Sequence, residues 1–447
     1  MLEALTVGSF ALVCLVSIFR TSWALSLLVV FFPFKQALQA SSGFFISNFA
    51  LPNYIVALIL GLAALREGIT RERPFVGYLS IQFVGTMSML AWSVISLVWT
   101  PARDSATEFI LANAPYVVLY ILLGPLLIRS VSEYRSFLFA LLPISSLVAV
   151  VMLLNPTFSS ESGRLGVQIA ANVRTNPLVI GELGGVMIIT AALIRGDSAG
   201  TGRTLVRAIA MCAGTILAFQ SGSRGQVAFA VLVAVLCFPV ARRVRNVGGF
   251  FGAALGSITV AGVVIVVAQY ALQGNLLKRW DADSLDEGLG IRLANLLDLF
   301  YVWLSTPLAW VFGLGFNAFS SLGAAQAAQG YTHNIPVDIL AELGLPMFCL
   351  FVAMLVQAIR SSAWLLGRFG DEPSNRSVCA IAIAFAAYQF LLANKQGMLW
   401  ASPALFLSFL TLSRLESRER LESPVTPGGS ELTDVQGPDG EMQVARA

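Results

Sequence analysis

The sequence predicts an all-α, polytopic membrane protein with about 12 or 13 transmembrane helices and one large helical loop outside the bilayer. Hydrophobic residues make up 57% of the chain and charged residues only 12%, whereas soluble domains carry roughly 25% charged residues. Apolar runs that are long enough to cross a bilayer recur from end to end. Arginines gather in alternate loops between these runs, as in multi-pass proteins. These observations exclude a string of soluble domains.

The apolar runs give the order of the elements. The first two runs are short, and they fit either a helical hairpin or one spanning helix followed by an interfacial segment. We expect a transmembrane domain over 1–413, with the loop 272–334 inserted in it. The predicted spans are roughly 4–19, 22–38, 50–65, 77–99, 108–128, 135–154, 177–194, 205–220, 225–240, 250–271, 335–359, 377–393 and 398–413.

Residues 414–447 differ in composition from the rest of the chain. They are polar, rich in Pro and Gly, and have no apolar period, which predicts a disordered cytoplasmic tail. We expect the basic residues at its start to contact anionic lipid headgroups. The cysteines all lie in apolar runs, where thiols pack as small hydrophobes, so we expect neither a disulfide nor a zinc site: Cys14, Cys212, Cys237, Cys349 and Cys379.

The arginines predict the orientation, because cytoplasmic loops carry an excess of basic residues. One alternating set of loops of this inner-membrane protein is therefore placed in the cytoplasm: Arg66, Arg71, Arg73, Arg129, Arg135, Arg195, Arg203, Arg207, Arg242, Arg243, Arg245, Arg360, Arg368, Arg376, Arg414, Arg418 and Arg420. The opposite loops then face the periplasm: 39–49, 100–107, 155–176, 221–224, 272–334 and 394–397.

The periplasmic side nevertheless holds a group of basic residues, most of them close to predicted helix ends. Such residues oppose the positive-inside trend. They fit either a shared anionic ligand, which we favour for the group, or interfacial anchors and partners in loop ion pairs. They are Lys35, Arg103, Arg164, Arg174, Arg224, Lys278, Arg279, Arg292 and Lys395.

His333 is the only histidine of the chain. Asn334 is a good N-cap for the span that follows, and Pro336 suits its first turn. His333 would then lie at the positive end of the helix dipole, which disfavours imidazolium and keeps the ring neutral. A neutral imidazole can accept a proton from a hydroxyl. The alternative is a histidine that only hydrogen-bonds the loop.

Several arginines are placed to bind phosphate oxygens. Arg224 lies in a very short outward turn, 220–225, between two apolar spans. Arg292 is expected to start another helix in the large loop, and Arg164 and Arg174 flank the loop that precedes the next span. A guanidinium near a helix N-terminus suits phosphate oxygens. Several forked cations that face one polar cavity fit a diphosphate better than a sugar hydroxyl.

The acidic and aromatic residues of this region carry weaker signals. Glu342 lies about two turns into its predicted span, and we favour a structural ion pair with one of the arginines. Asp281 and Asp283 form a D-x-D pair, which is too common to predict a metal site, so we expect neither a metal nor a cofactor. The loop aromatics fit either sugar stacking or anchoring at the membrane interface: Trp280, Phe316 and Tyr331.

These residues, in this order, resemble the O-antigen polymerase and O-antigen ligase family of bacterial envelope enzymes. The resemblance covers roughly residues 160–360 and is carried by a few short motifs. They are Ser223-Arg224 at the opening of a span, Arg292 and Trp303 ahead of Gly313-x-Gly315, and His333-Asn334 followed by Leu340-x-Glu342-x-Gly344. Pro336 and Pro346 depart from the family pattern at the local helix start.

The resemblance implies a membrane glycosyltransferase of the GT-C type, which needs no metal and uses an undecaprenyl-diphosphate-linked glycan at the periplasmic face. Arg224 and Arg292, helped by Arg164 or Arg174, would hold the diphosphate as it leaves. His333 would take the proton of the acceptor hydroxyl, with inversion at the anomeric carbon. Further donor contacts are expected from Lys278, Arg279, Trp280, Tyr331 and Asn334, and structural roles from Gly313, Gly315 and Glu342.

Three functions remain open on the sequence. A polymerase extends a lipid-linked repeat unit, and we favour it because it is the more widespread activity of the family. A ligase transfers the finished glycan to lipid A core or to a protein. A flippase for the same lipid-linked sugars is less favoured, because most basic residues lie at one rim. The expected partners are the donor, a glycan or lipid acceptor, membrane lipids and a chain-length regulator, but no nucleic acid.

Overall fold

The computed structural model describes residues 2–71, 73–155, 158, 165–166, 168–170, 173–195, 201–244, 246, 248–249, 251–252, 255, 262, 283–322 and 334–422. Residues 168–170, 173–174, 283–289, 291 and 292 are described by their backbone alone. The chain is an all-α multi-pass membrane protein, which confirms the predicted fold class. Within the described residues, 10 helices are long and apolar enough to cross a membrane.

Helices dominate because a bilayer offers no water to backbone N–H and C=O groups, so each spanning segment must pair them internally. The candidate spans are α1 (Leu2–Phe19), α2 (Thr21–Ser41), α4 (Leu51–Thr70), α5 with a short 3-10 turn (Ile81–Val98), α6 with its continuation (Arg103–Leu127), α7 (Val131–Leu154), α9 (Thr201–Gln220), α10 (Arg224–Arg242), α17 (Leu345–Arg368) and α18 (Pro373–Gln396).

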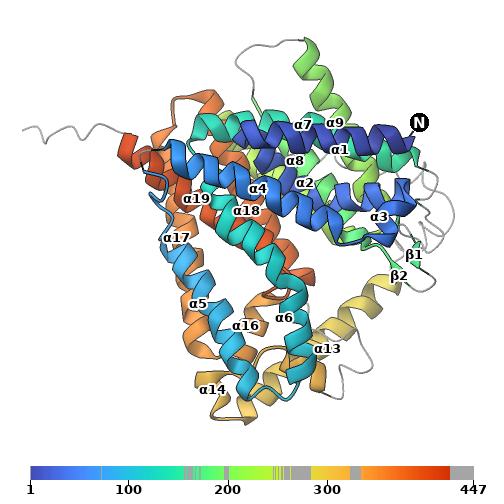
Figure 1. Cartoon of the computed structure of the whole chain (residues 1–447). Coiled ribbons are helices and arrows are strands. Elements are labelled where there is room, and N and C mark those ends of the chain that lie inside the picture. Colours follow the sequence, from blue (N-terminus) through green and yellow to red (C-terminus); the bar gives the residue numbers. More distant parts are fainter. Residues whose placement is uncertain are drawn as a thin grey trace, which may run out of the picture.

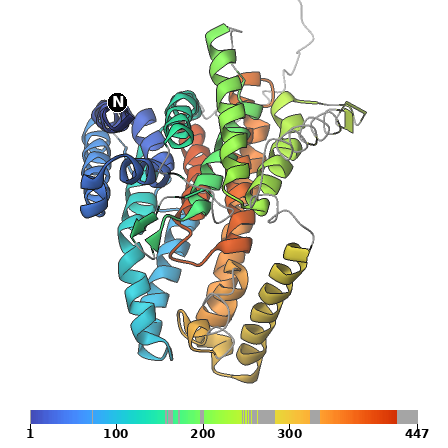
Figure 2. The same cartoon turned by 90° about the vertical axis from the view of Figure 1, so that its right-hand side faces the viewer.

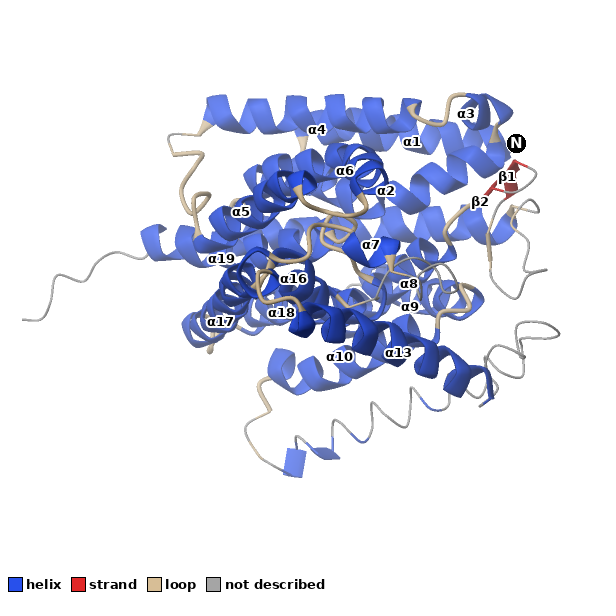
Figure 3. Cartoon of the chain, turned by 90° about the horizontal axis from the view of Figure 1, so that it is seen from below, coloured by secondary structure: helices blue, strands red, loops and turns tan. Residues whose placement is uncertain are grey.

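The remaining elements are shorter or more polar. They are α3 (Gly43–Ser47), α8 (Pro177–Leu193), α13 (Asp283–Ser305), α14 (Ala309–Phe312), the 3-10 turn η4 (Ala318–Ser321), α16 (Ile335–Leu343) and α19 (Pro403–Glu422). Two short antiparallel strands, β1 (Gln168–Ala170) and β2 (Val173–Arg174), form a hairpin. In Figure 3 this hairpin lies at one edge of the molecule, beside α3 and the N-terminus.

The first two helices form an antiparallel hairpin, one of the two arrangements that the sequence allows. Thr6 and Ser41 join its open end, with 3.1 Å between their hydroxyl oxygens. At the closed end, Arg66 of α4 donates to the carbonyl of Ile18, at 2.9 Å. Since α2 is also largely buried against its neighbours, it belongs to the core of the bundle rather than to the membrane interface.

The bundle has two distinct ends. At the start of α18, Arg376 donates to the carbonyl of Val240 at 2.7 Å, and Ser377 donates to that of Leu193 at 2.8 Å. The ends of α8 and α10 therefore lie at the start of α18. We call this the arginine-rich end, and Figure 1 shows it toward the upper left, where α4, α17 and α19 finish. The start of α10 and the end of α18 lie at the opposite end.

The predicted span 335–359 is wrong as a single helix. The structure breaks it into α16 and α17 at Gly344, whose φ of 87° and ψ of 172° suit only glycine. Pro336 and Pro346 lie in the first turns of the two helices, where the missing N–H of proline is tolerated. The apolar run continues across this break, so hydropathy alone does not reveal it.

The C-terminal boundaries also differ from the prediction. The predicted span 398–413 begins later, at Pro403, and α19 continues to Glu422. Residues 414–422 are therefore helix rather than disordered tail, because the buried Arg414 and Leu415 fix this helix against the bundle. The rest of the predicted tail, and almost all of the predicted span 250–271, lie outside the described residues.

The described part of the large loop is helical, as the sequence predicts. Its main element, α13, is the gold helix at one edge of the bundle in Figure 2. The C-terminal half of α13 packs on α14 and α16 through an apolar cluster that includes Leu299, Trp303 and Ala341. The indole of Trp303 donates to the carbonyl of Ala309, at 2.9 Å, and fixes the turn between α13 and α14.

Candidate functional site

The turn between α9 and α10 places one end of the candidate site. Gly222 has a φ of 64°, and the backbone N–H of Ser223 donates to the hydroxyl of Ser221 at 3.2 Å. Ser223 is the N-cap residue of α10, but its hydroxyl does not cap the helix. It accepts a hydrogen bond from Lys395 Nζ at 2.6 Å instead. The end of α18 is thereby fixed against the start of α10.

Gly225 leaves the space that Lys395 occupies. A Cβ atom at this position would lie 2.5 Å from Lys395 Cδ and 2.9 Å from Nζ, so any larger residue would displace the lysine. Arg224 is the first residue of α10. Two cationic side chains therefore belong to the few residues around the start of this helix.

The electrostatics of this turn favour an anion. The N-terminus of α10 carries the positive end of a helix dipole, and Arg224 adds its charge there. Lys395 lies in the last turn of α18, whose dipole stabilises it, but it also lies over the start of α10. The combination of two cations and a helix N-terminus is the arrangement that binds phosphate groups.

The start of α16 lies against the residues that follow α18. The Asn334 side chain accepts a hydrogen bond from the Val337 N–H at 3.1 Å, which confirms it as the N-cap of α16. A Cβ atom at Gly397 would lie 2.9 Å from Ile335 Cδ1. The first residue of α16 thus lies against the chain two residues after Lys395. We call this group the rim cluster, and its members are Ser223, Arg224, Gly225, Asn334 and Lys395.

Glu342 holds the far end of α16. Its two carboxylate oxygens accept the backbone N–H groups of Asn317, at 2.8 Å, and Phe319, at 3.3 Å. Among the residues that the structure describes, these amides take the place of the arginine that the sequence led us to expect. The carboxylate is buried and ties the loop after α14 to α16. Its role is therefore structural, although not as an ion pair.

Gly313 and Gly315 let that loop approach α16 closely. Both have positive φ, 78° and 96°. A Cβ atom at Gly313 would lie 2.0 Å from the carbonyl oxygen of Glu342, and one at Gly315 would lie 2.6 Å from Thr100 Cα. The N–H of Gly315 donates to the Glu342 carbonyl at 3.0 Å. Both glycines therefore allow the loop to approach α16 and Thr100 closely.

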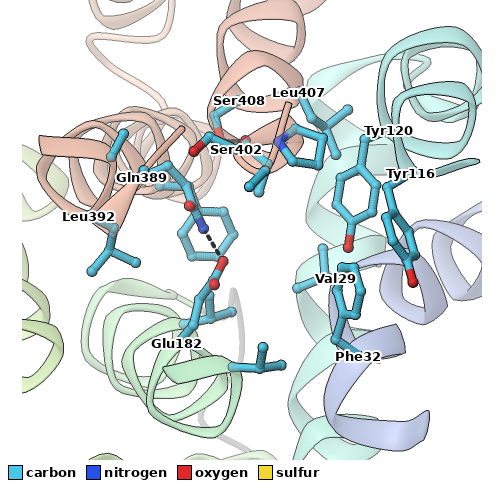
Figure 4. Close-up of a pocket in the computed structure, with 18 of the residues that line it drawn as sticks. Val29, Phe32, Tyr116, Tyr120, Glu182, Gln389, Leu392, Ser402, Leu407 and Ser408 are labelled. Carbon is cyan, nitrogen blue, oxygen red and sulfur yellow. Dashed lines mark hydrogen bonds between the residues drawn. The ribbon is translucent and has the colours of Figure 1, made fainter. Parts of the chain in front are cut away.

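A largely apolar cavity of about 450 Å³ opens next to the rim cluster. It follows α18 from Ala382 to Gln396, and its lining includes Gly397, which lies beside the start of α16. Its walls also come from α2, α6, α8 and α19, and Figure 4 shows Phe32, Tyr116 and Leu407 among its lining. A cavity of this size and polarity suits a small organic ligand or part of a chain molecule.

One polar pair faces this cavity. Glu182 of α8 accepts a hydrogen bond from Gln389 Nε2 at 2.6 Å, as Figure 4 shows. Tyr120, on another wall, donates its hydroxyl to the Leu28 carbonyl at 2.8 Å. Sequence reasoning missed Glu182. The available signal was a carboxylate within an otherwise apolar helix, which marks a functional or paired residue.

The remaining predicted residues are placed only in part. Arg292 does not start a helix, because α13 begins at Asp283 and Arg292 lies in its interior. Arg174 lies on β2 opposite Gln168, and the side chains of both arginines are not described. The other predicted residues fall outside the described residues: Arg164, Lys278, Arg279, Trp280, Tyr331 and His333.

Lys395 is the residue that sequence reasoning undervalued. It counts among the outward basic residues, yet nothing in the sequence links it to Ser223 across the fold. Its signal is its charge on the side where the positive-inside trend expects few cations. Within the described ranges, no group of three or more histidine, cysteine or acidic side chains gathers to hold a metal ion.

Comparison of the chain with protein-family models and with curated proteins gives no match in either set. The features of the chain that bear on function are the rim cluster, the cavity beside it and the order of residues in the sequence.

Proposed function

We propose that the chain is a membrane glycosyltransferase that lengthens a lipid-linked glycan at the periplasmic face. Its donor is a glycan on undecaprenyl diphosphate, and its acceptor is a sugar hydroxyl of a second lipid-linked unit. The observation that carries the proposal is the rim cluster. It sets Arg224 and Lys395 at the start of α10, next to the start of α16.

The donor has two parts with opposite chemistry, and the site offers a surface for each. The diphosphate matches two cations at a helix N-terminus, where charge-assisted hydrogen bonds are strong. Part of the isoprenoid chain matches the apolar cavity of about 450 Å³ whose lining includes Gly397. A soluble sugar nucleotide would fill the first surface but leave the second empty.

The chemistry needs a base and a stabilised leaving group. His333 directly precedes Asn334, the cap of α16. The acceptor oxygen attacks the anomeric carbon and passes its proton to the imidazole, while the bond from that carbon to the diphosphate oxygen breaks. Arg224 and Lys395 balance the charge that grows on the leaving diphosphate. Attack from the face opposite the diphosphate inverts the anomeric centre.

The test replaces Arg224, Lys395 and His333 singly by Ala and measures the glycan chain length on a gel. The proposal expects loss of long chains in all three variants while the protein stays at its normal level in the membrane. Lys395→Arg is the matched control, because it keeps the positive charge, and it should retain part of the activity. Unchanged chain length in all three Ala variants at normal protein level refutes the mechanism.

A polymerase and a ligase differ in the acceptor that receives the glycan, so the product in a null strain distinguishes them. A null strain that shows one repeat unit on its core lipid supports the polymerase. A strain that shows bare core with accumulated lipid-linked polymer supports the ligase. In proteoliposomes, a flippase moves labelled lipid and forms no new glycosidic bond, so this outcome would replace glycosyl transfer altogether.

A further inference from the structure

At the arginine-rich end, the carboxylate of Glu67 contacts several guanidinium groups, whose total positive charge exceeds its single negative charge. It is 1% exposed and lies at the end of α4. Arg129 donates to both of its oxygens, at 2.8 Å from Nε and 2.7 Å from Nη2. Arg71 donates from Nε at 2.8 Å, and Arg66 donates from Nη2. All the acceptor positions of the carboxylate are therefore used by three guanidinium groups.

Arg71 is the least satisfied of these groups. Its side chain is only 12% exposed. Its Nη2 lies 2.7 Å from Glu67 Oε2 without the geometry of a hydrogen bond, and its buried Nη1 has no hydrogen-bond partner. A buried N–H of a charged group without an acceptor is costly. Burial lowers the pKa of Arg71, Arg129 and Arg418 act in the same direction, and Glu67 offsets part of this shift.

The helix α19 adds two more guanidinium groups to this end. Arg414 is fully buried and donates to the carbonyls of Val76 and Pro74 in the loop before α5. Arg418 donates to the carbonyls of Arg73, at 2.6 Å, and Pro74, at 3.2 Å. These carbonyls are neutral, so they satisfy hydrogen bonds without cancelling the charge.

The nearby carboxylates do not restore neutrality. Glu133 lies 3.5 Å from Arg129 but is 40% exposed, and Glu422 attracts Arg418 from the end of α19. Among the described residues, five guanidinium groups thus face three carboxylates: Arg66, Arg71, Arg129, Arg414 and Arg418 against Glu67, Glu133 and Glu422. We call this set of eight residues the arginine cluster.

The position of the cluster indicates which kind of anion would balance its excess positive charge. Two candidate spans, α4 and α5, respectively end and begin at this cluster, so its depth is that of the lipid headgroups. Anionic headgroups attract basic residues at the cytoplasmic surface, with about 1 kcal/mol per Lys or Arg. A phosphate group offers several acceptor oxygens to forked guanidinium donors, which suits a cluster in which the guanidinium groups outnumber the carboxylates.

We infer that the arginine cluster binds one phosphate-bearing anion through its excess positive charge, beside Arg71 and Arg418, at the end of the bundle opposite the rim cluster. The source of the phosphate is an anionic phospholipid or a soluble phosphate. This site is separate from the proposed glycosyl transfer, and its existence does not depend on that activity.

Native mass spectrometry of the full chain in detergent tests this inference. The probes are phosphatidylglycerol, phosphatidylcholine and inorganic phosphate. The variants are Arg71→Gln, which leaves Glu67 with two arginine partners, and Arg418→Gln, which touches no carboxylate in a hydrogen bond. The control is Arg360→Gln, which removes the same charge from an exposed position on α17.

The expected result is that phosphatidylglycerol binds more tightly than phosphatidylcholine. Each cluster variant should lower this affinity by roughly five- to tenfold, whereas the control variant keeps it. Displacement of the lipid by millimolar inorganic phosphate assigns the site to a soluble phosphate, and retention of the lipid assigns it to a headgroup. Equal affinity of the wild-type chain and both cluster variants for phosphatidylglycerol overturns the inference, as does a preference for phosphatidylcholine.

Discussion

Replacement of Gly344 by Ala tests the break between α16 and α17, which sets the direction of the helix that Asn334 caps. Gly344 has φ 87° and ψ 172°, a region that only glycine occupies without strain of about 1–3 kcal/mol. The new Cβ would lie 2.3 Å from the Val311 carbonyl oxygen. Displacement of α14 would also weaken two backbone hydrogen bonds to α16, from Leu314 and Gly315, each contributing about 1 kcal/mol. We expect a loss of stability of about 2–5 kcal/mol.

The assay is unfolding of the purified chain in mixed micelles by titration with sodium dodecyl sulfate, followed by circular dichroism. The matched control is Gly61→Ala in the middle of α4, where a new Cβ meets nothing within 4 Å. This control should be neutral or stabilise by about 0.5–1 kcal/mol. If Gly344→Ala and Gly61→Ala unfold at the same detergent fraction, the reasoning about the break is refuted.

Three further predictions concern the rim cluster and Glu342, which holds the far end of α16. Lys395→Ala should abolish long glycan chains, whereas Ser223→Ala should shorten them, because the hydroxyl only positions the lysine; equal effects of both changes on chain length would contradict this. Glu342→Gln should destabilise the chain by about 1.5–3 kcal/mol, since an amide offers one acceptor oxygen to two backbone donors, and its chain-length defect should scale with protein level in membranes. Gly225→Ala should lengthen the distance from Lys395 to the start of α10 and lower activity at normal protein level, and unchanged activity would show that this lysine is not needed there.

Local features of the site could be predicted from the sequence. Asn334 was recognisable as the cap of α16 because the preference for Asn at this position acts within a single turn. The structural roles of Gly313 and Gly315 were suggested by their place in the motif order. The hydropathy of the chain indicates the spans because lipid requires apolar helices whatever their neighbours. These features depend on few residues and little on the rest of the fold.

Contacts between distant segments could not be predicted. The hydrogen bond from Lys395 to Ser223 joins two helices that are remote in the chain, and no local preference encodes it. Glu342 was expected to meet an arginine, because charge alone suggests an ion pair, but backbone amides satisfy it instead. The position of Arg292 inside α13 was missed because the acidic and small residues after Asp283 gave no clear apolar period.

The two cationic ends of the bundle differ in the groups that surround their cations. This difference indicates their functions better than the number of basic residues does. At the arginine-rich end, Glu67 and a set of carbonyls fix the guanidinium groups as part of the structure. At the rim, Arg224 is the first residue of α10, where the helix dipole raises the free energy of its charge, whereas Lys395 lies in the last turn of α18, whose dipole stabilises it, and reaches the same turn. A cation at a helix N-terminus lowers the stability of the fold but favours the binding of an anion there. The rim is therefore the better candidate for turnover, and the arginine-rich end for a ligand that stays bound.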